Sequence, residues 1–178
     1  KEIGGGVFGY CSSLTSMPSL NTDVIPSGCF YGCNGLKNIT IPSKYKSIEN
    51  GAFYRCEGLT DVVIEEGITK LDNSAFAYCS ALKNITIPKT VTVIDEHVFE
   101  DHGTALTISG YSATTAETYA IANNIPFLNL DLNVKTASTL DDTSVGVTIS
   151  TSKSNFSDYA EIRLTNTEAA KTAAQSAV

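Results

Sequence analysis

The chain is poor in positive charge. Its 178 residues include 12 Lys and Arg against 19 Asp and Glu, which gives a formal net charge of −7. Non-specific binding to nucleic acid or to anionic lipid needs clustered basic residues, so we expect no nucleic-acid partner. No uninterrupted apolar run approaches the ~20 residues of a membrane span, so we expect no membrane insertion. The chain starts at Lys1 without an initiator Met and inside a repeat, so we expect a fragment, and the missing leader says nothing about where the parent protein resides.

Apolar residues return together at a nearly constant spacing. Phenylalanine occurs at intervals of 22, 23, 23 and 23 residues, at Phe8, Phe30, Phe53, Phe76 and Phe99. Four further rows keep this register. One row precedes the phenylalanines and consists of Ile3, Ile25, Ile48, Leu71 and Ile94. Three rows follow them: the first is Cys11, Cys33, Cys56 and Cys79, the second is Leu14, Leu36, Leu59 and Leu82, and the third is Met17, Ile39, Val62 and Ile85. A fixed period of this length predicts a solenoid, in which each coil buries its apolar residues only against its neighbours.

Each coil contains a short alternating stretch that predicts a β-strand. The sequence LKNITI at residues 82–87 alternates apolar and polar residues toward its end, and Pro88 follows directly. Alternation gives a strand one buried face, and proline ends the strand because it has no N–H for the ladder. Stacked coils would place these strands in one parallel sheet. The return side, from Ile48 or Leu71 into the Phe–Cys segment, is expected in turns and short 3₁₀ pieces.

This pattern resembles the BspA-type leucine-rich repeat, whose consensus runs roughly LxxIxIPxxVxxIxxxAFxxCxx. The match extends from Ile3 to about Leu130. The resemblance implies a leucine-rich-repeat solenoid, with a parallel β-sheet, irregular return segments and a short helix in a C-terminal cap. Terminal repeats differ from internal ones because they cover the end of the core.

Residues 108–130 resemble the closing segment of that family, a short helix and a last strand. Thr114 and Glu117 have capping-box spacing for a helix that ends near residues 123–124. In the last coil His102 takes the position of the row cysteine. We also expect two residues fewer from Phe99 to Ile108 than in the counterpart segment 76–87.

The composition changes after residue 130. Residues 131–178 contain no cysteine, no proline and one glycine, and Ser and Thr supply 15 of these 48 residues. Alternation predicts strands at 145–149 and 160–164, and a helix is indicated from about residue 167. We therefore assign residues 1–130 to the solenoid with its cap and residues 131–178 to a small β-rich accessory segment, truncated or leaning on the solenoid. Modules of this kind resemble those that follow the repeats in bacterial surface proteins.

Three roles are open to the cysteine row, and packing is favoured. Neighbouring coils would hold these residues about 5 Å apart with parallel side chains, whereas the Cβ atoms of a disulfide lie about 3.8 Å apart. Zinc needs four thiolates that converge tetrahedrally, which a straight row does not supply. Free cysteine packs as a small hydrophobe. Cys29, in a row with Val7, Ala52, Ala75 and Val98, is likewise expected to be small and buried.

The chain offers no catalytic constellation. Its only histidines, His97 and His102, lie in the acidic stretch DEHVFEDH at residues 95–102. A metal site there is conceivable, but a solvated edge is favoured, and neither histidine has a nucleophile partner. The residues leave open a glycosidase-like acid pair, although a rod offers it no obvious pocket. The glycines at 4–6 align with turns of later coils and lack a following Lys-Ser/Thr, which argues against a phosphate loop. We expect neither an enzyme nor a cofactor or metal.

Two surfaces are candidates for binding. The outward positions of the predicted sheet vary in charge and shape over a constant frame, which suits a binding face and equally an ordinary solvated face. These positions are Lys37, Asn38, Thr40, Thr60, Asp61, Val63, Lys83, Asn84 and Thr86. On the return side, Tyr10, Tyr31, Tyr54 and Tyr78 form a second candidate, either as an interface or as a half-buried seal of the core.

The resemblance to BspA-type adhesins implies a non-catalytic binding module located extracellularly or at the cell surface. Its expected partner is a surface or matrix protein of a host or neighbouring cell, bound on the sheet face. The alternative is a structural spacer that presents another domain without a ligand of its own. An enzymatic role, in which the parent domain of the tail acts on glycans, ranks third.

Overall fold

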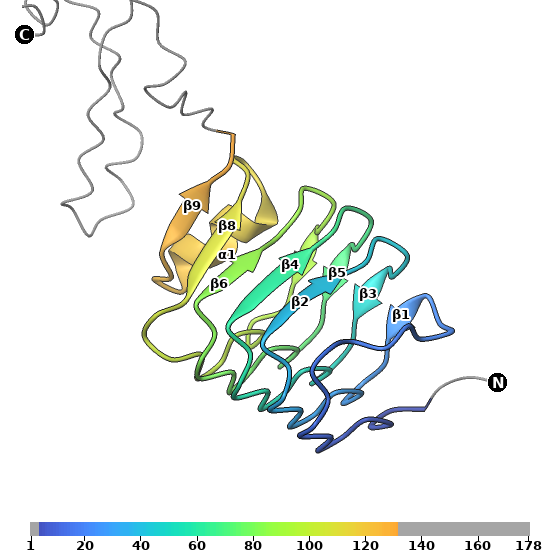
Figure 1. Ribbon diagram of the computed structural model, residues 1–178. Coiled ribbons are helices and arrows are strands. Elements are labelled where there is room, and N and C mark those ends of the chain that lie inside the picture. The colour runs from blue at the N-terminus through green and yellow to red at the C-terminus, as the bar shows by residue number, and fades with distance from the viewer. Residues whose placement is uncertain (1–3, 132–178) are drawn as a thin grey trace, which may run out of the picture. The chain divides into compact units, whose positions relative to one another are not determined.

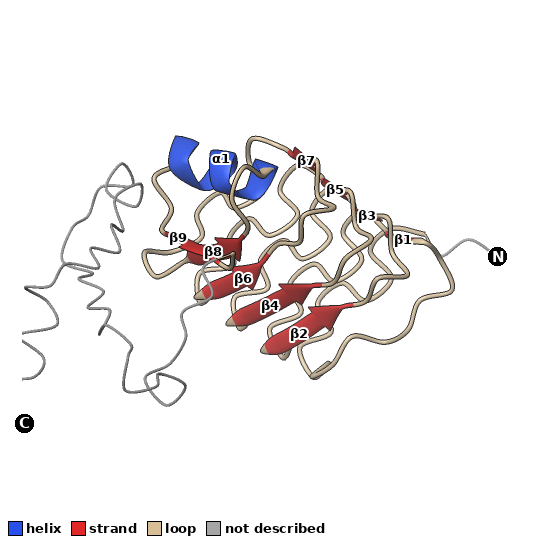
Figure 2. Ribbon diagram, turned by 90° about the horizontal axis from the view of Figure 1, so that it is seen from above, coloured by secondary structure: helices blue, strands red, loops and turns tan. Residues whose placement is uncertain are grey.

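A computed structural model describes residues 4–131 as a stack of coils (Figure 1). Five strands form one sheet in the order β2-β4-β6-β8-β9, and four two-residue strands form a second in the order β1-β3-β5-β7. The bounds are β1 Val24–Ile25, β2 Asn38–Ile41, β3 Ser47–Ile48, β4 Asp61–Ile64, β5 Lys70–Leu71, β6 Asn84–Thr86, β7 Val93–Ile94, β8 Thr107–Gly110, α1 Thr115–Ala122 and β9 Phe127–Asn129. Figure 2 shows the two sheets on different sides of the coils, with α1 at the end of the stack. Apart from residue 131, the predicted accessory segment 131–178, with its strands and helix, lies outside the described residues.

The five-stranded sheet follows from the repeat period. Ile39 pairs with Val62, Val62 with Ile85 and Ile85 with Ile108, all in parallel. Within β2, burial alternates from residue to residue as the sequence predicts. Because the register is constant, every inward row is continuous from coil to coil, and so is every outward row.

The return side contains the expected turns, together with a second sheet that the sequence did not indicate. No 3₁₀ helix forms within residues 4–131. The backbone N–H groups alternate in direction instead: the N–H of Phe30 donates to Ala52 O of the next coil at 2.8 Å, whereas the N–H of Tyr31 donates back to Gly28 O at 3.0 Å. Since every second N–H is bonded to the neighbouring coil, the i→i+3 pattern of a 3₁₀ helix is not continued.

The phenylalanine row forms a ladder of stacked rings through the core. The centroids of Phe30 and Phe53 lie 5.2 Å apart, and those of Phe53 and Phe76 lie 5.1 Å apart with parallel planes. Phe99 ends the row and meets Tyr119 of α1 edge-on at 5.7 Å. Each inner ring is fully buried, so α1 completes the ladder where no further phenylalanine follows.

The cysteines are free thiols, and four of the five are buried, which confirms their packing role. The thiols of Cys33, Cys56 and Cys79 also make hydrogen bonds that the sequence did not reveal. Cys56 Sγ donates to Phe30 O of the preceding coil at 3.1 Å, and Cys79 Sγ donates to Phe53 O at 3.2 Å. The expectation is wrong for Cys11, which is exposed. Cys11 belongs to the first described coil, which has a neighbouring described coil on one side only.

The last coil is not shortened, in contrast to the expectation. Ile108 pairs with Ile85 and not with Ile87, so the spacing from the phenylalanine is unchanged. The predicted helix is confirmed: Thr114 is its N-cap, and the Thr114 side chain accepts from Glu117 N. Its C-cap is Asn123. This helix is short, and none within residues 4–131 has the length and apolarity to cross a membrane.

Candidate binding surfaces

The nine predicted sheet-face residues lie in β2, β4 and β6 or directly before these strands, which are neighbours in the larger sheet (Figure 1). They form three rows across the coils, and all are exposed or half-buried. The first row is Lys37, Thr60 and Lys83; the second is Asn38, Asp61 and Asn84; the third is Thr40, Val63 and Thr86. The rows are open to solvent, and ligand binding by these residues stays a prediction.

The second row is a hydrogen-bonded ladder. Asn84 Nδ2 donates to Asp61 Oδ1 at 2.7 Å. When the Asn38 amide is turned so that its nitrogen faces Asp61, Asn38 Nδ2 donates to Asp61 Oδ2 at 2.9 Å. Hydrogen bonds from Asn84 and Thr60 lower the pKa of the Asp61 carboxyl, because they stabilise its charged form. The side chains of Asn38, Asp61 and Asn84 therefore bind mainly to one another.

The atoms that remain available to a partner lie on either side of this ladder. Lys37 and Lys83 are exposed on one side of it, and Val63 on the other side is 43% exposed. Thr40 is exposed and Thr86 is half-buried. The sheet face thus offers two cations and an apolar side chain beside a fixed polar row, a combination suited to a protein surface.

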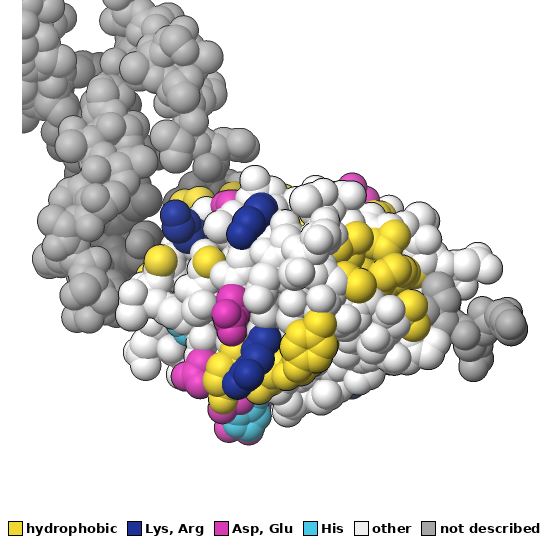
Figure 3. Space-filling model, turned by 60° about the horizontal axis from the view of Figure 1, so that its bottom comes forward, with side chains coloured by type: hydrophobic (Ala, Val, Ile, Leu, Met, Phe, Trp, Pro, Cys, Tyr) yellow, Lys and Arg dark blue, Asp and Glu magenta, His cyan; other side chains and the backbone are white. Residues whose placement is uncertain are grey.

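The four predicted tyrosines are also brought together, on the side where the Phe–Cys turns lie. Their rings follow one another at 4.9, 5.1 and 5.1 Å from Tyr10 to Tyr78. Tyr10 is 73% exposed and the other three are half-buried. Sequence reasoning missed Arg55, whose guanidinium lies 5.5 Å from the Tyr78 ring. Figure 3 shows hydrophobic side chains on this side next to basic and acidic ones.

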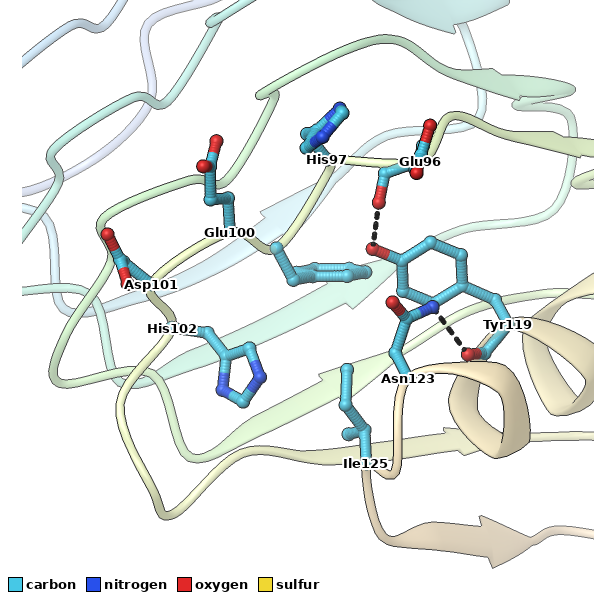
Figure 4. Close-up of a pocket in the computed structure, with 9 residues that line it drawn as sticks. Glu96, His97, Glu100, Asp101, His102, Tyr119, Asn123 and Ile125 are labelled. Carbon is cyan, nitrogen blue, oxygen red and sulfur yellow. Dashed lines mark hydrogen bonds between the residues drawn. The ribbon is translucent and has the colours of Figure 1, made fainter.

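A hollow of about 330 Å³ lies between the last coil and α1, and His97 and His102 line it (Figure 4). Tyr119 donates its hydroxyl to Glu96 O at 3.0 Å, and Asn123 Nδ2 donates to Tyr119 O at 2.9 Å. Within residues 4–131, no three His, Cys, Asp or Glu side chains are close enough to hold a metal ion. Sequence reasoning did not indicate the hollow, because it depends on where α1 lies.

Residues 1–127 match the BspA type leucine rich repeat region in six copies. The chain belongs to the BspA type leucine rich repeat family. Among solved structures, this BspA-type chain is similar to a leucine rich cell surface protein from Faecalibacterium prausnitzii A2-165, with 35% identity and a TM-score of 0.48. That match covers 54% of this chain and 25% of the other, so the chain spans a small part of that protein. No curated protein matches the sequence.

Proposed function

We propose that this chain is a non-catalytic, protein-binding repeat module of a bacterial cell-surface or secreted protein. Its partner would be a surface or matrix protein of a host or neighbouring cell, bound on the outer face of β2, β4 and β6. Membership of the BspA-type family and the similarity to a leucine rich cell surface protein support the location.

The proposal rests on the rows of outward side chains, which a rigid frame of buried rows holds in place. The inward rows are buried and nearly invariant from coil to coil, whereas the outward rows change from Lys37 and Thr40 to Asp61 and Val63. A face with exposed cations and an exposed apolar side chain matches the mixed chemistry of protein interfaces. Because the register fixes the positions of these side chains, the backbone of the face does not have to become ordered on binding. This lowers the entropic cost of association.

The test compares two variants with the same change of net charge. The sheet-face variant carries Lys37→Glu, Val63→Lys and Lys83→Glu, which leave the Asn38–Asp61–Asn84 ladder intact. The control carries Lys46→Glu and Val93→Glu on the return side. Purified chains would be screened against extracellular-matrix and cell-surface proteins, with circular dichroism to confirm folding. A partner bound by the wild type and the control, and lost in the sheet-face variant, supports the proposal.

The second candidate function is a structural spacer without a ligand. It is favoured by the Asn38–Asp61–Asn84 ladder, which stiffens the stack and engages polar groups that a ligand would otherwise use. Absence of any partner in the screen would support the spacer, whereas a partner that both variants bind equally would show that the chain binds through another surface.

A further inference from the structure

The side of the solenoid that contains the Phe–Cys turns carries a continuous strip of four tyrosines and one arginine. We call it the tyrosine strip and define it as Tyr10, Tyr31, Tyr54, Arg55 and Tyr78. Tyr31 and Tyr54 are stacked with their planes 14° apart. Arg55 lies against two rings, with its Cζ 5.9 Å from the centroid of Tyr54 and 5.5 Å from that of Tyr78. Tyr10 and Arg55 are exposed, and Tyr31, Tyr54 and Tyr78 are half-buried.

The backbone beneath the strip has a conformation that favours glycine. The second residue after each phenylalanine of the row has positive φ: 59° at Tyr10, 66° at Gly32, 56° at Arg55, 59° at Tyr78 and 50° at Asp101. Glycine occupies this position without strain, as Gly32 does, whereas residues with a Cβ are strained there. Strained residues persist more often at functional sites than elsewhere. Three coils thus present a large side chain where glycine would be the least strained choice.

We propose that the tyrosine strip binds a proline-rich segment of a partner protein in the polyproline II conformation, with Lys or Arg next to the prolines. Two successive ring spacings of 5.1 Å lead from Tyr31 to Tyr78. A polyproline II helix rises about 3.1 Å per residue with three residues per turn, so prolines at i and i+3 recur at about 9 Å. Such prolines would contact every second ring of the strip.

The chemistry of the strip favours this occupant over three others. A sugar stacks on the face of an aromatic ring, and the faces of Tyr31 and Tyr54 are covered by each other. A β-strand repeats its same-side residues every ~6.7 Å, which matches neither one spacing nor two. The carbonyls of an α-helix are bonded internally, whereas those of polyproline II are free to accept hydrogen bonds from tyrosine hydroxyls.

Charge at one end of the strip fits a basic flank in the partner. Glu100 and Asp101 are exposed, and both carboxylates lie close enough to Tyr78 to raise its pKa, Asp101 through a hydrogen bond. Glu57 is exposed two coils before Glu100. Lys or Arg in the bound segment would pair with these carboxylates, and the overall charge of −7 would favour the approach of a cationic segment.

The experiment measures binding of two labelled peptides to the purified chain by fluorescence anisotropy. The probe is (Pro-Pro-Ala)₃-Lys-Lys, and the control is (Gly-Gly-Ala)₃-Lys-Lys, which has the same charge without the polyproline II preference. We expect the proline peptide to bind at least tenfold more tightly than the glycine peptide. Equal binding of the two, or no measurable binding of either, would overturn the proposal.

Variants of the chain then test whether the proline peptide binds at the tyrosine strip. Tyr54→Phe keeps the ring and removes a hydroxyl, and it should weaken binding several-fold. Tyr78→Gly suits the positive φ at that position, so it should fold, and together with Tyr10→Ser it should weaken binding at least tenfold.

The sheet-face variant Lys37→Glu, Val63→Lys, Lys83→Glu should bind the peptide as the wild type does, which separates this proposal from the proposed function. Unchanged binding in the tyrosine variants, or binding of chitin oligosaccharides at the strip in place of the peptide, would show that it is wrong.

Discussion

At the residue scale, the phenylalanine ladder gives single side chains a large share of the stability. Phe76 is fully buried between the rings of Phe53 and Phe99, whose centroids lie 5.1 and 5.7 Å away. Replacing Phe76 with Ala opens a cavity between two coils and should lower the free energy of unfolding by about 3–5 kcal/mol. Replacing the exposed Lys83 with Ala should cost under about 0.5 kcal/mol. Denaturant titration followed by circular dichroism measures both changes, and equal losses would contradict the register.

The cysteines supply a second prediction at this scale, because burial separates their reactivity. Burial raises the pKa of Cys29 to about 11 and that of Cys56 to about 12, and it also raises that of Cys79. The thiolate is the reactive form, so these groups should be inert toward thiol reagents at about pH 8. Cys11 is exposed. A thiol titration of the native protein should find one fast group of the five cysteines, and all five after denaturation. Several fast thiols in the native protein would show that the row is open to solvent.

At the scale of elements, the cap is held to the last coil by charged contacts beyond β9. Asp131 accepts from the N–H of Ser112 at 2.7 Å, and Lys89 Nζ lies 3.1 Å from Asp131 Oδ1. The Ser112 hydrogen bonds, followed by the contact with Lys89, lower the pKa of the Asp131 carboxyl to about 2. The contact ties the end of β9 to the turn that precedes α1.

This lowered pKa predicts a pH dependence of cap stability. Because the folded pKa of Asp131 lies below its ordinary value of 3.8, its contribution is fully present above that value and is lost as the pH falls toward about 2. Asp131→Asn should therefore lower the thermal midpoint at about pH 6 and have little effect at about pH 2. Thermal melts of wild type and variant at both pH values measure this. A constant difference between the two proteins would show that the carboxylate charge is not the stabilising feature.

The elements also show what the sequence could predict and why. The strands of the larger sheet follow from Ile39, Val62 and Ile85 at a constant period, since a constant period fixes a parallel register. The second sheet could not be predicted, because a strand of two residues such as Val24–Ile25 shows no alternation. The last coil was misaligned because Leu106 and Ile108 have the same spacing as Ile85 and Ile87, while His102 gives no apolar marker in the cysteine row.

The candidate surfaces were predictable in position and less so in chemistry. Outward positions follow from the register, but the hydrogen bonds of Asp61 depend on side-chain directions in two neighbouring coils. Arg55 was missed for a related reason, since its contact with Tyr54 and Tyr78 joins two coils and depends on its positive φ.

At the scale of the described solenoid, each coil is stabilised by its neighbours, so local stability should differ along the stack. The first described coil is covered on one side: Val7 is 51% exposed and Tyr10 is 73% exposed. Phe53 lies in an inner coil and is fully buried. The inter-coil bonds themselves are alike, with 2.9 Å from Phe8 N to Cys29 O and 2.8 Å from Phe53 N to Ala75 O.

Native-state hydrogen exchange should therefore separate two amides whose hydrogen bonds have the same geometry. The amide of Phe8 should exchange much faster than that of Phe53, because opening the first coil breaks one inter-coil interface and opening an inner coil breaks two. Mass spectrometry of peptic peptides would measure this, with Phe76→Ala as the matched variant. That substitution should speed exchange at Phe53 and leave Phe8 nearly unchanged if coils open individually. Acceleration at both sites by the same factor would mean that the solenoid opens as one cooperative unit, and nearest-neighbour stability would then be the wrong description.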